Sequence, residues 1–328
     1  MKNHRRAVIL SAAILSAGLM ATAALAEEAP TAAPGNLSPI AQAQEIETCK
    51  NVAYTGRLTA TDPEGDLITF QLCDKPARGS VDIAPDGTGN FVYTPYENKT
   101  GKDSFTFIAV DDKGNTSQPA RVSIRIRKPS TKVTYADMAG EASYNAALKL
   151  AEKKVMVGEC VGGTYYFHPD APVSRSEFVT MAMSALDLEP LTDVSATGFA
   201  DDGAIPTWAK GYVSSALRAG VVRGYPDPAG RVVFAPDSTV TRGEAAVMID
   251  RLISTTDVAV STFYADTVTA PAWAFQAAVN LETAGVLQTD EVGALALETN
   301  LTRGEAAQLL ASAMDVVEAR QTTGWFNW

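Results

Sequence analysis

A short phrase occurs three times in the second half of the chain and constrains its fold more than any other feature. Residues 240–246 read VTRGEAA, residues 301–307 read LTRGEAA, and residues 173–178 carry the looser copy VSRSEF. A repeated unit of this kind cannot bury its apolar face alone, so neighbouring copies stack on one another. The repeat therefore predicts one all-α body with pseudo-threefold symmetry, in which apolar helix stripes pack together.

Other landmarks keep their place in each copy. An aromatic residue opens the copy, aspartate follows two positions later, and a second aromatic follows nine positions after the first. A turn residue then ends the first helix, where glycine fits the left-handed conformation. In chain order these positions are Tyr135, Phe199 and Tyr264; Asp137, Asp201 and Asp266; Tyr144, Trp208 and Trp273; Lys154, Gly220 and Gly285.

Two residues of the repeated phrase have the spacing of a helix-capping box. The hydroxyl accepts a hydrogen bond from the third amide of the helix, and the glutamate accepts one from the amide of the cap residue. Such a cap is worth about 1 kcal/mol. We assign capping to Ser174 with Glu177, Thr241 with Glu244, and Thr302 with Glu305. The alternative is that these side chains contact a ligand directly.

The arginine of the phrase needs a different explanation, because a cation in the first helical turn faces the positive end of the helix dipole. Amides at a helix start favour an anion, and a guanidinium grips a carboxylate with two hydrogen bonds. The candidates are Arg175, Arg242 and Arg303. We expect Arg242 to contribute most and Arg303 less, since the third copy lacks the Phe-x-Pro-Asp loop. The alternative is a salt bridge to Asp137, Asp201 or Asp266.

The repeated aromatic and acidic residues leave two interpretations open. Trp208 and Trp273 can stack on sugar faces or anchor each helix pair in the core, and the residues alone favour the core. Asp137, Asp201 and Asp266 can accept from sugar hydroxyls or cap a helix.

The N-terminus predicts export. Residues 1–26 combine a basic start, an apolar stretch and the small-residue site Ala24-Leu25-Ala26, as a cleaved signal peptide does. A retained membrane anchor is the alternative, and no later run is apolar enough to span a bilayer. Cleavage would remove three positive charges and no negative ones, so the formal net charge of −11 would become −14. This charge disfavours nucleic acid and acidic lipid as partners.

Residues 45–127 predict an all-β sandwich. Short runs alternate apolar and polar residues, as in ARVSIRI, where Val122, Ile124 and Ile126 share one face. The turns DPEGD and DDKGN separate strands, and clustered carboxylates there can hold Ca²⁺, although acidic turns alone also explain them. Residues 27–44 and 128–134 are predicted linkers.

The cysteines predict one disulfide. Cys49 and Cys73 both fall in the predicted sandwich of an exported chain, and a bond between them would stabilise it by roughly 3 kcal/mol. Cys160 would then be the free thiol.

The sequence carries no enzyme motif that we recognise. After signal cleavage one histidine remains, His168. A Ser-His-Asp triad could use only this residue, and a zinc site would have only one ligand of its commonest type. The next copy has alanine at that position, which identifies His168 as a loop residue. We expect a non-catalytic protein that needs no cofactor.

Residues 45–127 resemble the bacterial cadherin-like and immunoglobulin-like modules of surface proteins, with the order LTATDPEGDLITFQL, GSVDI, DGTGNFVYTP and GKDSFTFIAVDDKGN. Residues 135–317 resemble three consecutive S-layer homology domains, with aromatic-x-Asp, a second aromatic, Phe-x-Pro and Thr-Arg-x-Glu. The copies span residues 135–191, 192–256 and 257–317, and a tail covers residues 318–328. The middle copy matches best; LALETN replaces the Phe-x-Pro-Asp loop in the third.

This resemblance implies a secreted, non-catalytic surface protein that is anchored non-covalently to the cell wall. Its partner would be an anionic, often pyruvylated, secondary cell-wall polysaccharide or modified peptidoglycan, held by the arginine in a groove between neighbouring copies. The residues it implicates in ligand binding are Asp137, Arg175, Asp201, Trp208, Arg242, Asp266, Trp273 and Arg303. The alternative is an adhesin or S-layer subunit that acts through a protein partner of the β-module.

Overall fold

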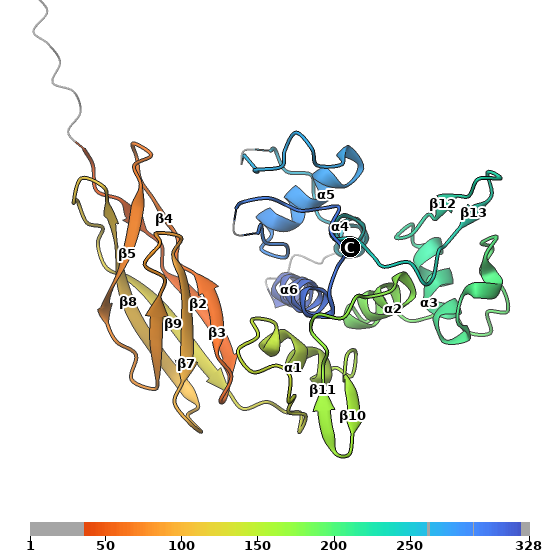
Figure 1. Ribbon diagram of the computed structural model, residues 1–328, viewed down its shortest axis with the longest axis horizontal. Helices are drawn as coiled ribbons and strands as arrows, with labels where there is room; N and C mark the ends of the chain where they lie inside the picture. The colour runs from red at the N-terminus through yellow and green to blue at the C-terminus, as the bar shows by residue number, and fades with distance from the viewer. Residues whose placement is uncertain (1–35, 261–262, 291, 323–328) are drawn as a thin grey trace, which may run out of the picture.

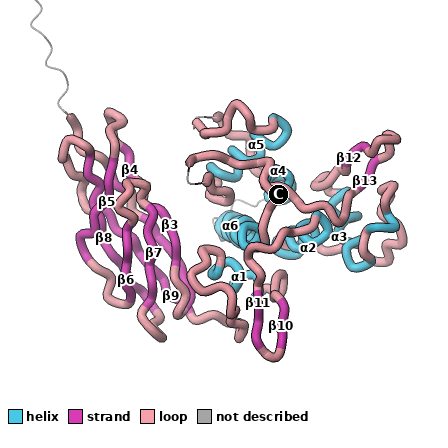
Figure 2. Tube along the Cα trace, in the orientation of Figure 1, coloured by secondary structure: helices cyan, strands magenta, loops and turns pink. Residues whose placement is uncertain are grey.

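A computed structural model describes residues 36–260, 263–290 and 292–322, so the predicted signal peptide lies outside the described residues. Two parts follow one another along the chain: a β-sandwich, and a body of helices with small hairpins (Figures 1 and 2). This order confirms the predicted fold class. No helix in the described ranges has the length and apolarity needed to cross a membrane.

The sandwich is made of two main sheets. One sheet has the strand order β2-β9-β8-β5 and the other β3-β7-β6; β2 is parallel to β9, and the other pairs are antiparallel. The strands are β2 (Gln44–Cys49), β3 (Tyr54–Arg57), β5 (Ile68–Asp74), β6 (Gly79–Ile83), β7 (Asn90–Pro95), β8 (Gly101–Asp111) and β9 (Ala120–Arg127). A short pair, β1 (Ile40–Ala41) with β4 (Ala60–Thr61), begins inside the predicted linker 27–44, so ordered structure starts earlier than expected.

Alternating side chains build the sandwich core as the sequence pattern predicts. Val122, Ile124 and Ile126 of β9 are buried, as are Phe105 and Phe107 of β8. Removing such side chains from water is the main stabilising contribution to a sheet pair.

The predicted disulfide is wrong. Cys49 and Cys73 are free thiols, and Cys49 is buried whereas Cys73 is exposed. They lie on β2 and β5, the two outer strands of one four-stranded sheet. Three strand spacings of about 4.8 Å put these strands roughly 14 Å apart, well beyond the reach of a disulfide. Cys160 is a free thiol too, on the exposed hairpin β10–β11.

Within the described ranges, the helical body has three central and three outer helices. The central helices α2 (Arg175–Ala185), α4 (Arg242–Ile253) and α6 (Arg303–Thr322) contact one another. Each outer helix packs on the central helix of the preceding copy: α3 (Thr207–Arg218) on α2, α5 (Ala272–Thr283) on α4, and α1 (Tyr144–Glu152) on α6. A 3-10 turn (Asp202–Ala204) and the hairpins β10 (Glu159–Val161) with β11 (Thr164–Tyr166) and β12 (Tyr225–Pro226) with β13 (Val232–Val233) complete the body.

A ring of backbone hydrogen bonds marks the pseudo-threefold centre. The amide of Val173 donates to the carbonyl of Leu301, that of Leu301 to Val240, and that of Val240 to Val173. All three side chains are fully buried. The predicted single helical body is therefore confirmed, and each copy contacts both others.

The sandwich and the helical body share a polar junction beside α1 (Figure 1). The Asn145 side chain accepts from the Cys49 amide at 2.9 Å and donates to the Ala53 carbonyl at 3.1 Å. The guanidinium of Arg127 pairs with the Glu152 carboxylate at 2.7 Å. Paired in this way, the polar groups of the junction are satisfied although partly removed from water.

Candidate functional site

Each central helix starts with a capping box. The Ser174 and Thr241 hydroxyls accept from the Glu177 and Glu244 amides, and the glutamates accept in return from the cap amides. At α6 the Glu305 amide donates to Thr302 at 3.2 Å, and the Thr302 amide donates to the Glu305 carboxylate at 2.9 Å.

The next two amides of each central helix are also occupied, by loop carbonyls of another copy. The amides of Arg175, Arg242 and Arg303 donate at 2.9 Å to Ser238, Thr299 and Ala171 respectively. The amides that follow them reach Pro236, Leu297 and Pro169 in the same loops. No open amide is therefore left at these starts for an anion, and the argument from the helix dipole does not apply. The repeated phrase instead joins the copies to one another.

The repeated aspartates hold the loop of their own copy. Each accepts two consecutive backbone amides: Asp137 those of Phe167 and His168, Asp201 those of Phe234 and Ala235, and Asp266 those of Leu295 and Ala296. None of the three pairs with an arginine among the described residues, so the alternative of an arginine–aspartate salt bridge is wrong. Burial alone would raise the pKa of Asp137, but the two amides outweigh it and lower that pKa.

The arginines instead point toward the capping glutamate of the following copy. Arg175 lies 3.6 Å from Glu244, and Arg242 lies 3.3 Å from Glu305. By the same rotation Arg303 faces Glu177, and both line one cavity, although no ion pair joins them among the described residues. The three equivalent positions therefore differ in how far the protein itself satisfies the guanidinium.

Arg242 is saturated by protein acceptors. Its guanidinium donates to the carbonyls of Leu295 and Gln288 at 3.2 and 2.8 Å, besides its contact with Glu305. Its side chain is only 12% exposed. The residue that we expected to contribute most to ligand binding is thus fully engaged within the body.

Arg175 is closed off. It is 5% exposed, and its guanidinium carbon lies 4.6 Å from the centre of the Tyr225 ring and 5.3 Å from that of Phe234. The Tyr225 hydroxyl donates to the Glu244 carboxylate, so the Tyr225 side chain lies against both members of the Arg175–Glu244 pair. Burial raises the pKa of Tyr225 further above its usual range, so this hydroxyl stays protonated and donates.

Arg303 is open. Its Nε donates to the Phe167 carbonyl at 2.9 Å and its guanidinium lies 5.1 Å from the Phe167 ring centre. In the part of the chain that the structure describes, its terminal nitrogens have no protein acceptor. It lines a cavity of about 500 Å³, within the range of small-molecule sites. We call this cavity the Arg303 groove; all three copies contribute, through Arg303, Glu177 and Trp208.

Both repeated tryptophans are exposed, so the interpretation as core anchors is wrong. Trp208 is 56% and Trp273 61% exposed, and each sits in the first turn of an outer helix, outside the set of residues that this helix buries. Trp208 borders the Arg303 groove. Tyr144, the equivalent residue in the first copy, is partly buried against the core.

Sequence reasoning missed two further residues of the groove. His168 lines it and contacts Glu159, Nε2 to carboxylate oxygen 3.2 Å. The backbone of His168 is left-handed (φ 59°), as is that of Ala235 and Ala296 at the equivalent positions. The clue was available in the sequence: a bulky histidine occupies a left-handed position where the other copies keep alanine.

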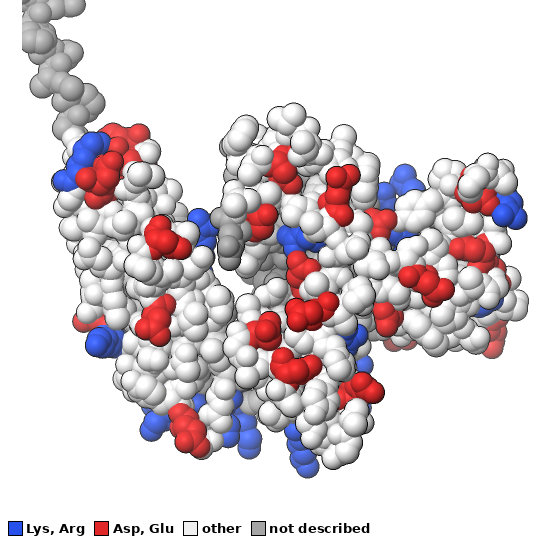
Figure 3. All heavy atoms as spheres, viewed as in Figure 1, with Lys and Arg blue, Asp and Glu red and all other residues white. Residues whose placement is uncertain are grey.

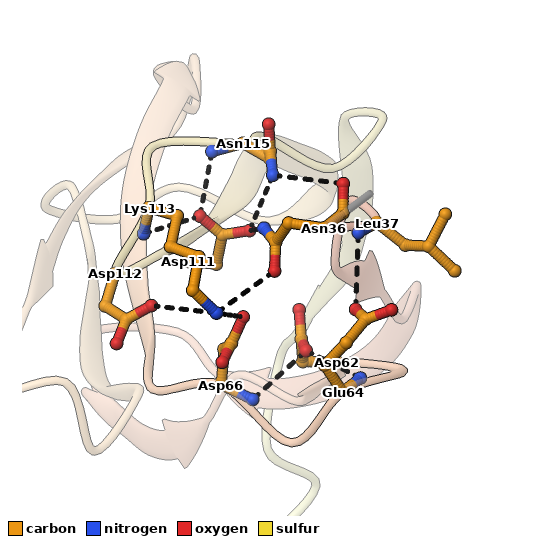
Figure 4. A network of polar contacts seen from close by, with 9 residues as sticks. All are labelled: Asn36, Leu37, Asp62, Glu64, Asp66, Asp111, Asp112, Lys113 and Asn115. Atoms are coloured by element: carbon orange, nitrogen blue, oxygen red, sulfur yellow. Dashed lines mark hydrogen bonds and ion pairs between the residues drawn. The ribbon is translucent and has the colours of Figure 1, made fainter. Parts of the chain in front are cut away.

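The acidic turns of the sandwich come together as a network (Figure 4). Oxygens of Asp62, Asp66 and Asp111 lie within 4.8 Å of one another, and the Asp62 Oδ2 atom is buried without a partner. The ammonium of Lys113 donates to Asp66 at 2.5 Å and so neutralises part of this charge from within. Calcium binding there stays a prediction.

Acidic and basic side chains are both scattered over the visible face of the molecule (Figure 3). No broad basic surface appears on this face, in keeping with the net charge of −11.

Two family models match the chain. Residues 36–125 match the bacterial Ig domain and residues 198–246 match the S-layer homology domain. The second match covers the loop, the capping phrase and Trp208 of the middle copy, and the structure shows the same loop and helix contacts in the other two.

Curated relatives share only part of their length with this chain. An exoglucanase XynX of Acetivibrio thermocellus is 30% identical over 135 residues, 40% of this chain and 12% of the relative. A surface-layer 125 kDa protein of Lysinibacillus sphaericus is 31% identical over 38% of this chain and 10% of its own. A cellulosome-anchoring protein of A. thermocellus is 27% identical over 37% of this chain and 26% of its own. The relative with an enzyme name matches through the anchoring region alone.

Proposed function

Because the chain carries an Ig-like domain and the S-layer homology module of cell-wall-associated, exported surface proteins, we propose that it is anchored through the Arg303 groove. The ligand is an acidic glycan of the cell wall, a secondary polysaccharide or modified peptidoglycan that can carry pyruvate. The protein acts as a non-catalytic anchor.

The observation that carries this proposal is the open guanidinium of Arg303 in a cavity of about 500 Å³. A carboxylate placed there can accept both terminal nitrogens of the arginine, a pairing that is roughly twice as strong as a neutral hydrogen bond. The Oε2 atom of Glu177 accepts from the amide and the hydroxyl of its cap residue, Ser174. The groove therefore suits one acid group per site.

Trp208 supports a sugar as the carrier of that acid. Its indole ring is exposed at the edge of the groove and offers an apolar face with a polar N–H, as aromatic residues at binding sites do. Glu159 on the hairpin β10–β11 and His168 in the loop that follows it line the same groove and can supply hydrogen-bonding partners for sugar hydroxyls. An acid on Arg303 and a sugar face on Trp208 together fit a short glycan segment.

The proposal is tested by cosedimentation of the purified chain with cell-wall sacculi from its source, before and after the non-peptidoglycan polymer is removed. Arg303→Ala should weaken binding about ten- to hundredfold, because a hydrogen bond to a charged group is worth roughly 1.5–3 kcal/mol. Arg303→Lys should rescue poorly, since an ammonium lacks the two-pronged geometry.

Matched controls separate the groove from general charge. Arg231 is an exposed arginine of the same body that pairs only with its neighbour Asp227 among the described residues, so Arg231→Ala should bind normally. Trp208→Ala should weaken binding, and Trp273→Ala should not, because Trp273 is equally exposed but is not among the residues that line the Arg303 groove. Binding that survives Arg303→Ala and Trp208→Ala unchanged would overturn the proposal.

The junction beside α1 supports a display role for the sandwich. Asn145 and the Arg127–Glu152 pair tie the sandwich to the first copy, so the anchored body would present it in a fixed orientation. An adhesin or S-layer role through a protein partner of the sandwich remains the alternative.

A further inference from the structure

We propose that Tyr225 masks a second site for the same acidic glycan, in which Arg175 and Glu244 correspond to Arg303 and Glu177. The proposal rests on the proposed function of the Arg303 groove. It predicts one open site in the native chain and two after the tyrosine is removed.

The two hairpins establish which residues are equivalent. In the first copy Glu159 pairs with Tyr166, and in the second copy Tyr225 pairs with Val233. A left-handed glycine precedes each, Gly158 and Gly224, with φ of 76° and 75°. Tyr225 therefore occupies the position that Glu159 has beside the open groove.

The side chains of Glu159 and Tyr225 lie differently relative to the arginine. The Glu159 carboxylate turns to His168 in its own copy, 3.2 Å away, and leaves the space above Arg303 empty. The Tyr225 ring instead covers the Arg175 guanidinium at 4.6 Å, and its hydroxyl donates to Glu244. One side chain thus fills the volume that a ligand would take.

The buried Arg175 guanidinium has a donor atom without a hydrogen-bond acceptor. Arg175 is 5% exposed, yet its Nε has no hydrogen-bond partner, and its closest carboxylate is 3.6 Å away. The equivalent Nε atoms of Arg303 and Arg242 both donate to carbonyls. Buried donors are rarely left unpaired, because desolvation without a partner is unfavourable. A carboxylate in place of the Tyr225 ring would supply acceptors.

The third copy sets a limit on the inference. Arg242 already has three protein acceptors, so removing a nearby side chain would not free it. The expected maximum is two sites per chain and not three.

Titration calorimetry on the full chain tests this, with a pyruvylated monosaccharide as titrant and the same sugar without the pyruvate group as control. The native chain should bind one equivalent and Tyr225→Ala two. Adding Arg303→Ala to Tyr225→Ala should leave one equivalent, the new site. Tyr225→Glu, which copies the first hairpin, provides the same test if the alanine variant does not fold.

Two results overturn the inference: a native chain that binds two equivalents, or folded Tyr225→Ala and Tyr225→Glu variants that still bind one. Loss of all binding in the single Arg303→Ala variant supports the proposed function independently. If that loss is seen while the Tyr225 variants stay at one equivalent, the masked site is wrong and the anchor proposal stands.

Discussion

Arg175 and Arg303 begin equivalent helices and yet have opposite environments. Both follow a capping residue, donate their amide to a neighbouring loop at 2.9 Å, and rest on a phenylalanine of that loop. Arg175 is sealed beneath Tyr225, whereas Arg303 faces a cavity. The packing of the repeat is thus retained at both helices, and the two arginines differ in whether the residue after the hairpin glycine, Tyr225 or Glu159, covers the guanidinium.

The largest expected effect is a difference in unfolding free energy between the alanine variants of these two arginines. Arg175→Ala should lower the free energy of unfolding by about 3 kcal/mol, because it leaves the Glu244 carboxylate without its cation and removes the guanidinium that packs on the Tyr225 ring. Arg303→Ala should cost less than about 1 kcal/mol, since it loses one hydrogen bond from a partly open side chain. Urea denaturation followed by circular dichroism measures both.

Arg175→Met is the matched control for this contrast. An apolar side chain of similar length keeps the packing on Tyr225 and Phe234 without a buried charge, so it should cost clearly less than alanine. If Arg175→Ala and Arg303→Ala prove equally stable, the distinction between a structural and an available arginine fails.

The capping phrase and the strand pattern could be predicted from sequence because both depend on neighbours along the chain. Thr241 and Glu244 are three residues apart, and their hydrogen bonds follow from that spacing alone. The alternation of Val122, Ile124 and Ile126 likewise determines which face is buried. The threefold body followed from the repetition of these local signals.

The choice between arginines could not be predicted, because it depends on contacts between copies. Arg242 meets the carbonyls of Gln288 and Leu295, and no motif identifies a backbone carbonyl as an acceptor. The disulfide prediction was wrong for a similar reason, because the distance between Cys49 and Cys73 depends on strand order and not on their spacing in the sequence. The loss of the Phe-x-Pro-Asp loop in the third copy changed the environment of Arg242, which reaches that loop, and not that of Arg303.

The second prediction concerns the caps, which should not differ between the two arginine environments. Thr241→Ala and Thr302→Ala should each lower stability by about 1 kcal/mol, since each hydroxyl accepts the third amide of its helix at 3.2 Å. Thermal melts of both variants, with Thr241→Ser and Thr302→Ser as controls that keep the hydroxyl, measure this. A Thr302→Ala variant that lost wall binding at full stability would give the cap a ligand role instead.

A smaller gain is expected at the end of the first outer helix. Lys154 has φ 61°, where the equivalent Gly220 and Gly285 have 72° and 73°. A left-handed non-glycine residue is strained by roughly 1–2 kcal/mol. Replacing it with glycine relieves this strain but also raises the conformational entropy of the unfolded chain, which offsets part of the stabilisation. Lys154→Gly should therefore stabilise by about 0.5–1 kcal/mol, whereas Lys153→Gly, one residue earlier in right-handed backbone, should destabilise. Melting temperatures that fall for both variants would show that this strain is absent.

The smallest expected effect appears only in acid and distinguishes the first copy from the second. The pKa of Asp137 is lowered: burial opposes this, but the amides of Phe167 and His168 and the nearby His168 ring favour the charged form. A carboxyl whose pKa is lower in the folded than in the unfolded chain leaves the unfolded chain with more bound protons, so stability rises with pH through that range. The contribution is complete above the ordinary value of 3.8 and is lost as pH falls through the lower folded pKa.

Urea unfolding between pH 5 and pH 2 should therefore show that the stability advantage of the native chain over Asp137→Asn shrinks as acid is added. His168→Ala, which gives the first copy the residue of the second, should reduce the same pH dependence by a smaller amount. A native-minus-variant difference that is constant across this pH range would mean that the Asp137 carboxylate holds its loop no better than a neutral amide does.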